Sequence, residues 1–286
     1  MPEAKVGIIG GSGLYNIEGL TNIDEVDINT PFGKPSDLIT TGELEGVVVA
    51  FLPRHGKGHT ISPTELPVRA NIYALKSLGV EHIISFNAMG SLRDELKPGD
   101  LVIPDQLIDR TRNRINTFFS EGIVVHVPFA EPFCPVLSQS VYQAAQELGA
   151  TVHYGGTMVV MEGPAFSTKA ESRLYRSWGA SVIGMTVLPE AKMAREAEIC
   201  YASIACVTDY DSWKELNEPV IVDVILKILR QGVSTAKDII KLAVSRIPQS
   251  RQCDCASALQ RGFPTSPDVI PNETKQKLKL LIGKYI

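Results

Sequence analysis

Short apolar segments rich in β-branched residues recur along the chain and predict buried strands. They are Val6–Ile9, Val47–Leu52, His82–Ser85, Asp100–Ile103, Thr157–Met161, Val182–Met185 and Ile199–Val207. Apolar positions at helical spacing predict helices over Glu65–Ser77, Pro135–Leu148, Ser167–Trp178, Leu188–Ala197 and Val220–Leu242. Because strands alternate with helices, we expect an α/β fold with a largely parallel sheet covered on both faces.

Composition and charge narrow the classes of protein. The 286 residues are 44% hydrophobic and 21% charged, which is typical of a globular protein with a sizeable core. The net charge is −4 without any basic block, so neither nucleic acid nor an anionic membrane is an expected partner. No apolar run approaches the roughly 18 residues of a membrane span, and the initial M-P-E-A-K lacks a signal-peptide pattern. We therefore expect a cytoplasmic protein.

Ligands of parallel α/β sheets bind beyond the carboxyl ends of the strands, so those positions are the place to look for chemistry. After Val6–Ile9, the stretch G-G-S-G offers glycine N–H groups and the hydroxyl of Ser12 to an anion. Its spacing differs from the G-x-G-x-x-G of a dinucleotide site. A tight turn is the alternative interpretation.

The loop P-R-H-G-K-G-H after Val47–Leu52 concentrates cationic and donor groups. Arg54 suits the bidentate binding of a phosphate. His55 and His59 stand four residues apart, as zinc ligands on a helix do, but the glycines between them argue against a helix. A solvated basic loop is the alternative, and the position at a strand end favours anion binding.

Three further strand ends carry small or hydroxyl residues. F-N-A-M-G-S-L, Phe86–Leu92, predicts a turn in which the amide of Asn87 is available. In E-G-P-A-F-S-T, Phe166 and Ser167 could line a pocket, and Ser167 is also a candidate N-cap for the next helix. G-M-T adds the hydroxyl of Thr186. Turns and caps explain each loop alone, but together the loops indicate an anion site.

The strand Ile199–Val207 leads into V-T-D-Y-D-S-W, with Asp209 and Asp211 two residues apart. On an extended chain these two acids point the same way. Burial and a nearby phosphate would raise the pKa of such a carboxyl, so that it could give a proton to a leaving group. The alternative is a strand-end pair that faces solvent or caps the next turn.

Ten motifs follow one another along residues 5–245. They are V-G-I-I-G-G-S-G-L, T-P-F-G-K-P-S-D, R-H-G-K-G-H, R-A-N-I-Y-A-L-K, G-S-L-R-D-E-L-K-P-G-D, D-Q-L-I-D-R-T, H-V-P-F-A-E-P-F-C, E-G-P-A-F-S-T-K-A-E-S, G-M-T-V-L-P-E-A and C-Y-A-S-I-A-C-V-T-D-Y-D-S-W. In this order they resemble the trimeric purine nucleoside phosphorylase superfamily, and most of all its 5′-methylthioadenosine phosphorylase branch. The resemblance implies a single α/β domain with a central mixed, mainly parallel β-sheet flanked by helices. Residues 1–250 would form this catalytic domain, and residues 251–286 a C-terminal extension packed on it.

The resemblance also implies a role for individual residues. Phosphate would be held by Ser12, Arg54, His55, the backbone of Ala88, and Thr186. The nucleoside would contact Phe166, Ser167, Met185, Asp209, Asp211, Val222, Ile225 and Leu226. His126 would reach in from a neighbouring subunit, because the family is built as a homotrimer or a dimer of trimers.

The implied reaction is phosphorolysis of 5′-methylthioadenosine to adenine and 5-methylthioribose 1-phosphate, a step of methionine and purine salvage. Asp209 would protonate purine N7, and Asp211 would accept a hydrogen bond from the 6-amino group, which a 6-oxopurine lacks. Inorganic phosphate is the nucleophile and co-substrate. Neither a cofactor nor a metal is expected.

Asn87 departs from the family pattern, in which we expect Thr or Ser at this position. It favours a runner-up, a purine nucleoside phosphorylase that accepts 6-amino and 6-oxo purines, methylthioinosine included. A nucleotide-binding oxidoreductase would need an acidic residue near position 30, where the chain reads I-N-T-P-F-G. A non-catalytic ligand-binding protein would leave the proton donor without a role.

The five cysteines are an odd number and do not suggest a secreted disulfide framework. Cys253 and Cys255 form a C-x-C pair, but a metal site needs about four ligands and no second pair stands nearby in the sequence. We therefore expect free thiols. A disulfide within the pair, or to Cys200 or Cys206, is the alternative.

Overall fold

The computed structural model describes residues 3–11, 14, 17–214, 222–248 and 250–286, without the side chains of residues 222–224. Its strands are β1 (Val6–Gly10), β2 (Thr21–Val26), β3 (Ile39–Leu44), β4 (Val47–Pro53), β5 (His82–Ser91), β6 (Leu101–Ile103), β7 (Gln106–Arg110), β8 (Val152–Tyr154), β9 (Thr157–Met161), β10 (Val182–Gly184) and β11 (Cys200–Asp209). Its α-helices are α1 (Val68–Ser77), α2 (Pro135–Glu147), α3 (Lys169–Ser177), α4 (Val187–Glu196), α5 (Val222–Ser245) and α6 (Asn272–Ile282). Three 3₁₀ helices complete it, η1 (Asp211–Trp213), η2 (Asp254–Ser257) and η3 (Pro267–Val269).

One mixed sheet forms the centre of the molecule. Its main path runs β2-β3-β4-β1-β5-β10-β9-β7, and β11 joins β5 to β6, which in turn pairs with β8. Within the described residues, six strand pairings are parallel and four are antiparallel. The predicted α/β class with a mainly parallel sheet is therefore confirmed.

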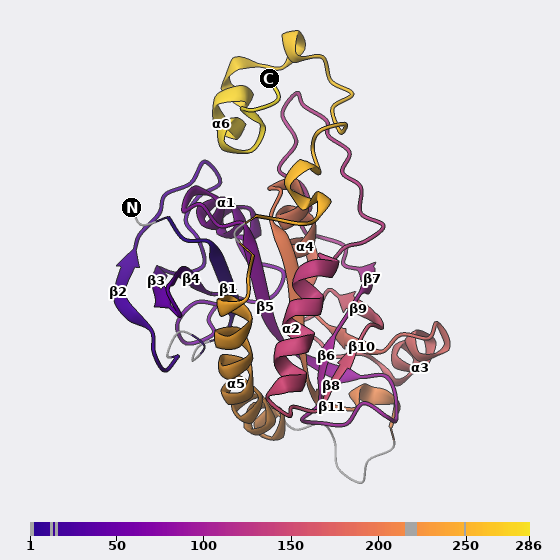
Figure 1. The fold of residues 1–286 in the computed structure, drawn as a ribbon. Coiled ribbons are helices and arrows are strands. Elements are labelled where there is room, and N and C mark those ends of the chain that lie inside the picture. Colours follow the sequence, from indigo (N-terminus) through magenta and orange to yellow (C-terminus); the bar gives the residue numbers. More distant parts are fainter. Residues whose placement is uncertain (1–2, 12–13, 15–16, 215–221, 249) are drawn as a thin grey trace.

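Helices cover both faces of this sheet, with α2 and α5 on one face and α1 and α4 on the other (Figure 1). The alternation along β11 follows the two faces. Cys200, Ala202 and Ile204 pack in the core on the α2 and α5 side, whereas Tyr201 and Ala205 pack on the α1 and α4 side. Both sets are buried, which is why the strand reads as a continuous apolar run rather than an alternating one.

The predicted turn over Phe86–Leu92 is wrong, because β5 continues through it to Ser91. Two neighbours share one edge of this long strand. β1 pairs with its beginning, up to Ser85, and β10 pairs with its end, from Gly90. Pairing with β11 on the other edge holds the intervening residues extended. Within the described residues, β5 is therefore unpaired on its first edge between β1 and β10.

Most predicted elements occur with shifted ends, and one predicted cap is wrong. The N-cap of α3 is Thr168 and not Ser167, because the hydroxyl of Thr168 accepts from the N–H of Glu171 while the Glu171 carboxylate accepts from the N–H of Thr168. The elements absent from the prediction, β2, β3, β7, β8 and α6, have mixed or polar sequences. Strand β2 is the extreme case, because T-N-I-D-E-V is almost entirely exposed.

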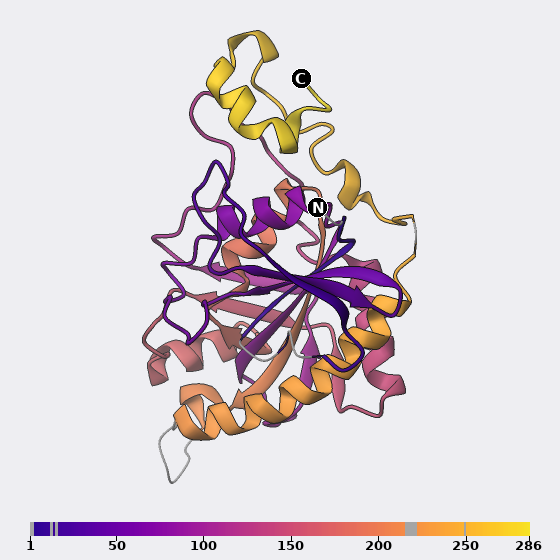
Figure 2. The same cartoon turned by 90° about the vertical axis from the view of Figure 1, so that its left-hand side faces the viewer.

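The chain after η2 and the segment 111–133 project together from one end of the sheet (Figures 1 and 2). In α6, the Thr274 hydroxyl donates to the Glu121 carbonyl of that segment at 2.6 Å, and Lys277 pairs with the Glu121 carboxylate at 2.9 Å. These contacts support the expected packing of the extension, while the boundary at residue 250 stays a prediction. Across the described helices, none is long and apolar enough to cross a membrane.

Candidate active site

Five strands bring the predicted site residues together at one end of the sheet, where β1, β4 and β11 finish. Strands β1, β4 and β11 all run parallel to β5 or to its neighbour, so their carboxyl ends lie at the same edge. The chain continues there as Gly10 and Gly11, as Arg54 and His55, and as Asp209. Strand β10 leads into Thr186, the residue before α4. Ser12 lies outside the described residues.

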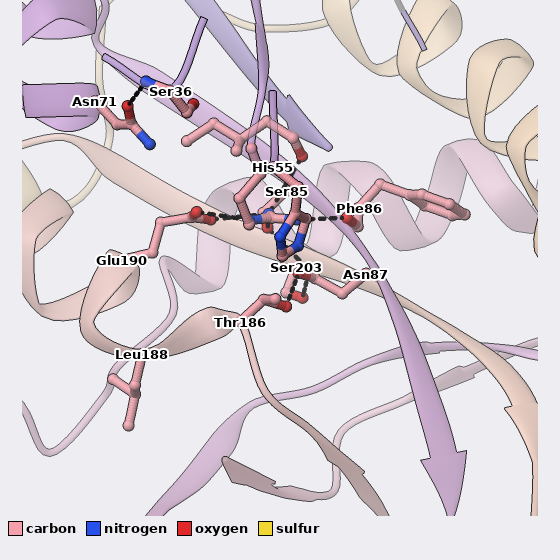
Figure 3. A network of polar contacts seen from close by, with 12 residues as sticks. Ser36, His55, Asn71, Ser85, Phe86, Asn87, Thr186, Leu188, Glu190 and Ser203 are labelled. Carbon is pink, nitrogen blue, oxygen red and sulfur yellow. Dashed lines mark hydrogen bonds and ion pairs between the residues drawn. The ribbon is translucent and has the colours of Figure 1, made fainter. Parts of the chain in front are cut away.

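Arg54 is buried, with 2% of its surface exposed, and is ion-paired to the equally buried carboxylate of Glu190, which is labelled in Figure 3. Its Nε and Nη2 donate to the two Glu190 oxygens at 2.9 and 3.1 Å. The Tyr201 hydroxyl donates to the same carboxylate at 2.7 Å. Burial alone would lower the pKa of Arg54, but the charge of Glu190 outweighs it and raises the pKa, so the guanidinium stays charged.

The remaining donors of Arg54 tie it to β5. Nη2 donates to Ser85 Oγ at 2.7 Å and Nη1 to the Phe86 carbonyl at 3.1 Å. Nη1 carries two hydrogens and has this single acceptor within the described residues. One N–H of the guanidinium is therefore available to an anion at the strand end.

Asn87 joins three elements through its side-chain amide (Figure 3). Nδ2 donates to Ser85 Oγ at 2.9 Å and to Ser203 Oγ of β11 at 3.0 Å. Oδ1 accepts from the Thr186 hydroxyl at 2.7 Å. Since Arg54 also bonds Ser85, a continuous chain of hydrogen bonds connects Glu190, Arg54, Ser85, Asn87 and Thr186. Asn87 therefore positions the predicted phosphate-binding residues.

Ala88 is the one exposed residue of β5, whose other nine residues are buried. It lies in the stretch where β5 lacks a partner on the edge between β1 and β10. Main-chain groups of a strand left unpaired on one edge can bind a ligand. The predicted backbone contact of Ala88 with phosphate is therefore sterically open.

Arg54 and His55 are not part of a solvated loop, which was the alternative for P-R-H-G-K-G-H. Arg54 and His55 are buried, and only the residues from Lys57 onward are exposed. His55 Nδ1 lies 2.8 Å from the Ile61 carbonyl, which can only accept, so Nδ1 carries the proton. Burial, and then the charge of Arg54, lower the pKa of His55 to about 4. The ring is therefore neutral near pH 7 and leaves Nε2 as an acceptor.

Asp209 and Asp211 sit together at the end of β11, but not on one extended strand. Asp209 ends the strand, and Asp211 begins η1 with a φ of 48°. The predicted parallel orientation is therefore wrong, because the chain turns between them. Burial and then the charge of Asp211 raise the pKa of Asp209, against hydrogen bonds from the Thr208 hydroxyl and the Asp211 N–H.

Asp211 carries an acceptor that nothing satisfies in the described part of the chain. The residue is 7% exposed, and its Oδ2 is buried without a hydrogen-bond partner. An unsatisfied buried carboxylate oxygen is costly, on the order of 1–3 kcal/mol or more. A ligand N–H placed against it would remove that cost.

Residues of the predicted base and ribose site gather beside η1. The Ser212 hydroxyl donates to the Ser167 carbonyl at 2.6 Å, which ties the loop before α3 to the end of β11. Phe166, beside it, is 55% exposed. Met185 lies against Gly163, where a Cβ would come within 2.5 Å of its sulfur, so a glycine is required for this approach.

The remaining predicted residues are less constrained. Val222 begins α5, and its side chain lies outside the described part. Ile225 is half-buried and Leu226 is 42% exposed on the same helix. The N–H of His126 bonds the Gly262 carbonyl, so His126 belongs to the segment beside the C-terminal extension. Figure 1 places that segment at the far end of the sheet from the start of α5. Within one chain, His126 therefore does not join Asp209.

Sequence reasoning missed the residues that hold the others in place. Glu190, Tyr201, Ser85 and Ser203 do not follow a strand end, and their role depends on contacts between distant elements. The available signal was an acid in an otherwise apolar helix, V-L-P-E-A, which predicts a buried charge that needs a partner.

A buried cation–carboxylate pair, a strand unpaired along part of one edge and two acids lie together at the carboxyl ends of the strands, where α/β enzymes bind their ligands. A profile of the phosphorylase superfamily matches residues 5–245. The chain belongs to this family.

Two relatives match over nearly their whole length. The S-methyl-5′-thioadenosine phosphorylase of Geobacter sulfurreducens is 58% identical over 285 residues, which cover 99% of this chain and 100% of that protein. The enzyme of the same name from Thermosynechococcus vestitus is 54% identical over 287 residues, with 99% of each chain covered. Among solved structures, a methylthioadenosine phosphorylase sourced from an Antarctic soil metagenomic library superposes with a TM-score of 0.94 and 47% identity, covering 98% of this chain and 99% of that chain.

Proposed function

We propose that this protein catalyses the phosphorolysis of 5′-methylthioadenosine to adenine and 5-methylthioribose 1-phosphate. The observation that carries the proposal is the half-buried Asp209, whose pKa is raised, at the carboxyl ends of the same strands as the charged Arg54. An acid and an anion site on one edge are what a phosphorolysis needs. Relatives that carry this activity in their names match the chain from end to end.

Asp209 is the general acid. Adenine is a poor leaving group as an anion, so its departure requires a proton at N7. A carboxyl whose pKa is raised by burial holds a proton more readily than an exposed one does, and it can release that proton to N7 as the glycosidic bond breaks. The ribosyl group becomes cation-like, and phosphate first stabilises and then captures it.

Asp211 selects the base. Its Oδ2 is buried and lacks a donor within the described residues, and the 6-amino group of adenine supplies one. A 6-oxopurine places an acceptor there, which would leave two acceptors facing each other. Among the contacts of the described residues, none favours the runner-up with broad purine specificity.

Phosphate binds among Ser12, Arg54, His55, the backbone of Ala88 and Thr186. The Nη1 hydrogen of Arg54 that has no acceptor among the described residues donates to its oxygens, and the Thr186 hydroxyl joins it by turning its hydrogen from Asn87 Oδ1 to the phosphate. His55 is neutral with its proton on Nδ1, so Nε2 accepts from the P–OH of monohydrogen phosphate. The positively charged Arg54 keeps its orientation because Glu190 holds the other side of the guanidinium.

Met185 lies along the ribose, Phe166 and Ser167 line the base, and Val222, Ile225 and Leu226 enclose the methylthio group. His126 completes the pocket of a neighbouring subunit in a homotrimer or a dimer of trimers. Its position beside the C-terminal extension, away from its own Asp209, supports this arrangement, as do the exposed Ile115 and Val124 of the same segment.

The reaction needs inorganic phosphate as co-substrate and no cofactor or catalytic metal. We place it in methionine and purine salvage in the cytoplasm, with small molecules and further copies of the chain as partners rather than nucleic acid or membranes.

The test is phosphate-dependent release of adenine from 5′-methylthioadenosine, measured beside adenosine and inosine and repeated without phosphate. We expect the highest kcat/KM for methylthioadenosine and no adenine release without phosphate. Equal rates with inosine would favour the runner-up, and adenine release that does not depend on phosphate would contradict phosphorolysis.

A further inference from the structure

Four of the five cysteines meet at one point of the molecule. The sulfur atoms of Cys134, Cys200, Cys253 and Cys255 all lie within 4.8 Å of one another. Cys200 Sγ and Cys253 Sγ are 3.4 Å apart. Cys253 is half-buried and the other three are buried. The sequence spacing did not indicate this cluster, because only Cys253 and Cys255 lie close together in the sequence.

Three separate elements contribute these thiols. Cys134 is the N-cap of α2 and Cys200 is the first residue of β11, while Cys253 and Cys255 frame the start of η2. Main-chain hydrogen bonds fix two of them, from Cys134 N to the Tyr201 carbonyl and from Cys200 N to the Glu81 carbonyl. The cluster is therefore positioned by the fold and not by one flexible loop.

The C-terminal extension is anchored next to this point through Glu198, two residues before Cys200. The Glu198 carboxylate accepts from the Tyr285 hydroxyl at 2.5 Å and pairs with Lys284 at 2.6 Å. Arg251 donates to the Glu198 carbonyl at 2.6 Å. These contacts hold the chain on both sides of Cys253 and Cys255 against the start of β11.

The separations fit a tetrahedral tetrathiolate site. Zinc–sulfur bonds of about 2.3 Å place the four sulfur atoms of such a site about 3.8 Å apart. Two disulfides would need only two short sulfur–sulfur distances, whereas one ion needs all four atoms near one another. The second pattern is the one observed.

A nearby positive charge and access from the surface also favour a zinc–thiolate site. A zinc ion with four thiolates carries two negative charges, and Arg251 lines the adjoining hollow together with Cys134, Cys200 and Cys253. The hollow has a volume of about 530 Å³ and opens to the surface, which provides an entry path.

We propose that Cys134, Cys200, Cys253 and Cys255 bind one structural Zn²⁺ that joins the C-terminal extension to α2 and β11. The role is structural because Cys200 and Asp209 stand at opposite ends of the ten-residue β11, which is on the order of 30 Å long. With four protein ligands the ion keeps no open position for substrate. The inference is independent of the proposed reaction, in which no metal takes part.

The direct test is the metal content of untagged protein purified without chelator. We expect about one zinc per chain in the wild type, the stoichiometry of a closed four-ligand site. The paired change Cys253→Ser with Cys255→Ser should abolish zinc binding and lower the Tm. The matched control is Cys206→Ser, since Cys206 is buried on the same strand as Cys200 but lies outside the cluster. It should keep the zinc.

A second measurement needs no variant. Cobalt exchanged into the wild-type protein should give the visible bands of tetrahedral Co²⁺ and a thiolate-to-cobalt charge-transfer band. Wild-type protein that holds no zinc, even after incubation with a zinc salt, would overturn the proposal. So would mass mapping under non-reducing conditions that finds two disulfides among the four cysteines, or cobalt bound without the thiolate band.

Discussion

The main-chain N–H of Asp211 donates a hydrogen bond of 2.7 Å to Oδ1 of Asp209. The two acids are therefore a single unit in which one residue uses its backbone to orient the other. The Thr208 hydroxyl holds Oδ2 of Asp209 at 2.8 Å from the other side. The Asp211 carboxylate itself is therefore available to the ligand. In the proposed reaction Asp209 donates the proton and Asp211 recognises the base.

Asp211→Asn should weaken the selectivity for adenine more than it lowers kcat. Asparagine tolerates the φ of 48° at this position, so the N–H bond to Asp209 remains. Loss of a charged acceptor for the 6-amino group costs about 1.5–3 kcal/mol, or on the order of 10- to 100-fold in selectivity. The measurement is the ratio of kcat/KM for methylthioadenosine to that for methylthioinosine. An unchanged ratio would remove Asp211 from base recognition.

The position of both acids at a strand end could be predicted from the sequence, but their mutual geometry could not. A buried apolar run followed by polar residues indicates a strand end, whereas the turn into η1 depends on the packing of Trp213, whose Nε1 donates to the Ser91 carbonyl. The same limit explains the wrong turn at Phe86–Leu92. Small residues there resemble a turn, and only the pairing with β11 holds them extended.

Arg54→Lys should raise the KM for phosphate by on the order of 10-fold or more, with a smaller effect on the KM for the nucleoside. Lysine keeps the charge, but it cannot bind Glu190 through two nitrogens and also reach Phe86 and a phosphate. The same change should lower the Tm, because the buried Glu190 loses a bidentate partner.

The matched control for this change is Arg173→Lys, at an exposed position of α3. It should leave both KM values and the Tm unaltered. A folded Arg54→Lys enzyme with the wild-type KM for phosphate would mean that Arg54 serves the structure alone.

Glu196 should make the protein less stable as the pH rises. Burial raises the pKa of its carboxyl from 4.5 to about 7, despite bonds of 2.7 Å from the Phe118 N–H and the Thr117 hydroxyl. The folded state therefore holds a proton that the unfolded state releases near pH 4.5. The stabilisation is complete below that pH and is lost as the pH rises to about 7, by up to about 3 kcal/mol.

Urea denaturation of wild type and Glu196→Gln at pH 5 and pH 8 measures this contribution. The variant should lose less unfolding free energy between the two pH values than the wild type does. Glu131→Gln, at an exposed position, is the control and should follow the wild type. Equal losses in the wild type and Glu196→Gln would show that Glu196 does not titrate in this range.

The cysteine cluster and the pair of Arg54 and Glu190 could not be predicted from sequence patterns. Glu190 lies 136 residues after Arg54, and Cys134 and Cys200 belong to different elements, so spacing carries no information about either contact. Local patterns predicted α2, α4 and β11, which carry Cys134, Glu190 and Cys200, but not η2. The contacts follow from strand order, which places β4 two strands from β5 and β11 against it.

The most direct test of the account is the kcat of Asp209→Asn on 5′-methylthioadenosine at saturating phosphate. Asparagine can still accept from the Asp211 N–H and donate to the Thr208 oxygen, so the local geometry is kept, but it has no acidic proton for N7. We predict that kcat falls by roughly 10²- to 10⁴-fold, the range of general acid catalysis, with a smaller change in KM. Asp238→Asn, an exposed acid on α5, is the control and should retain the wild-type kcat. A folded Asp209→Asn enzyme with near-wild-type kcat would contradict the assignment of Asp209 as proton donor.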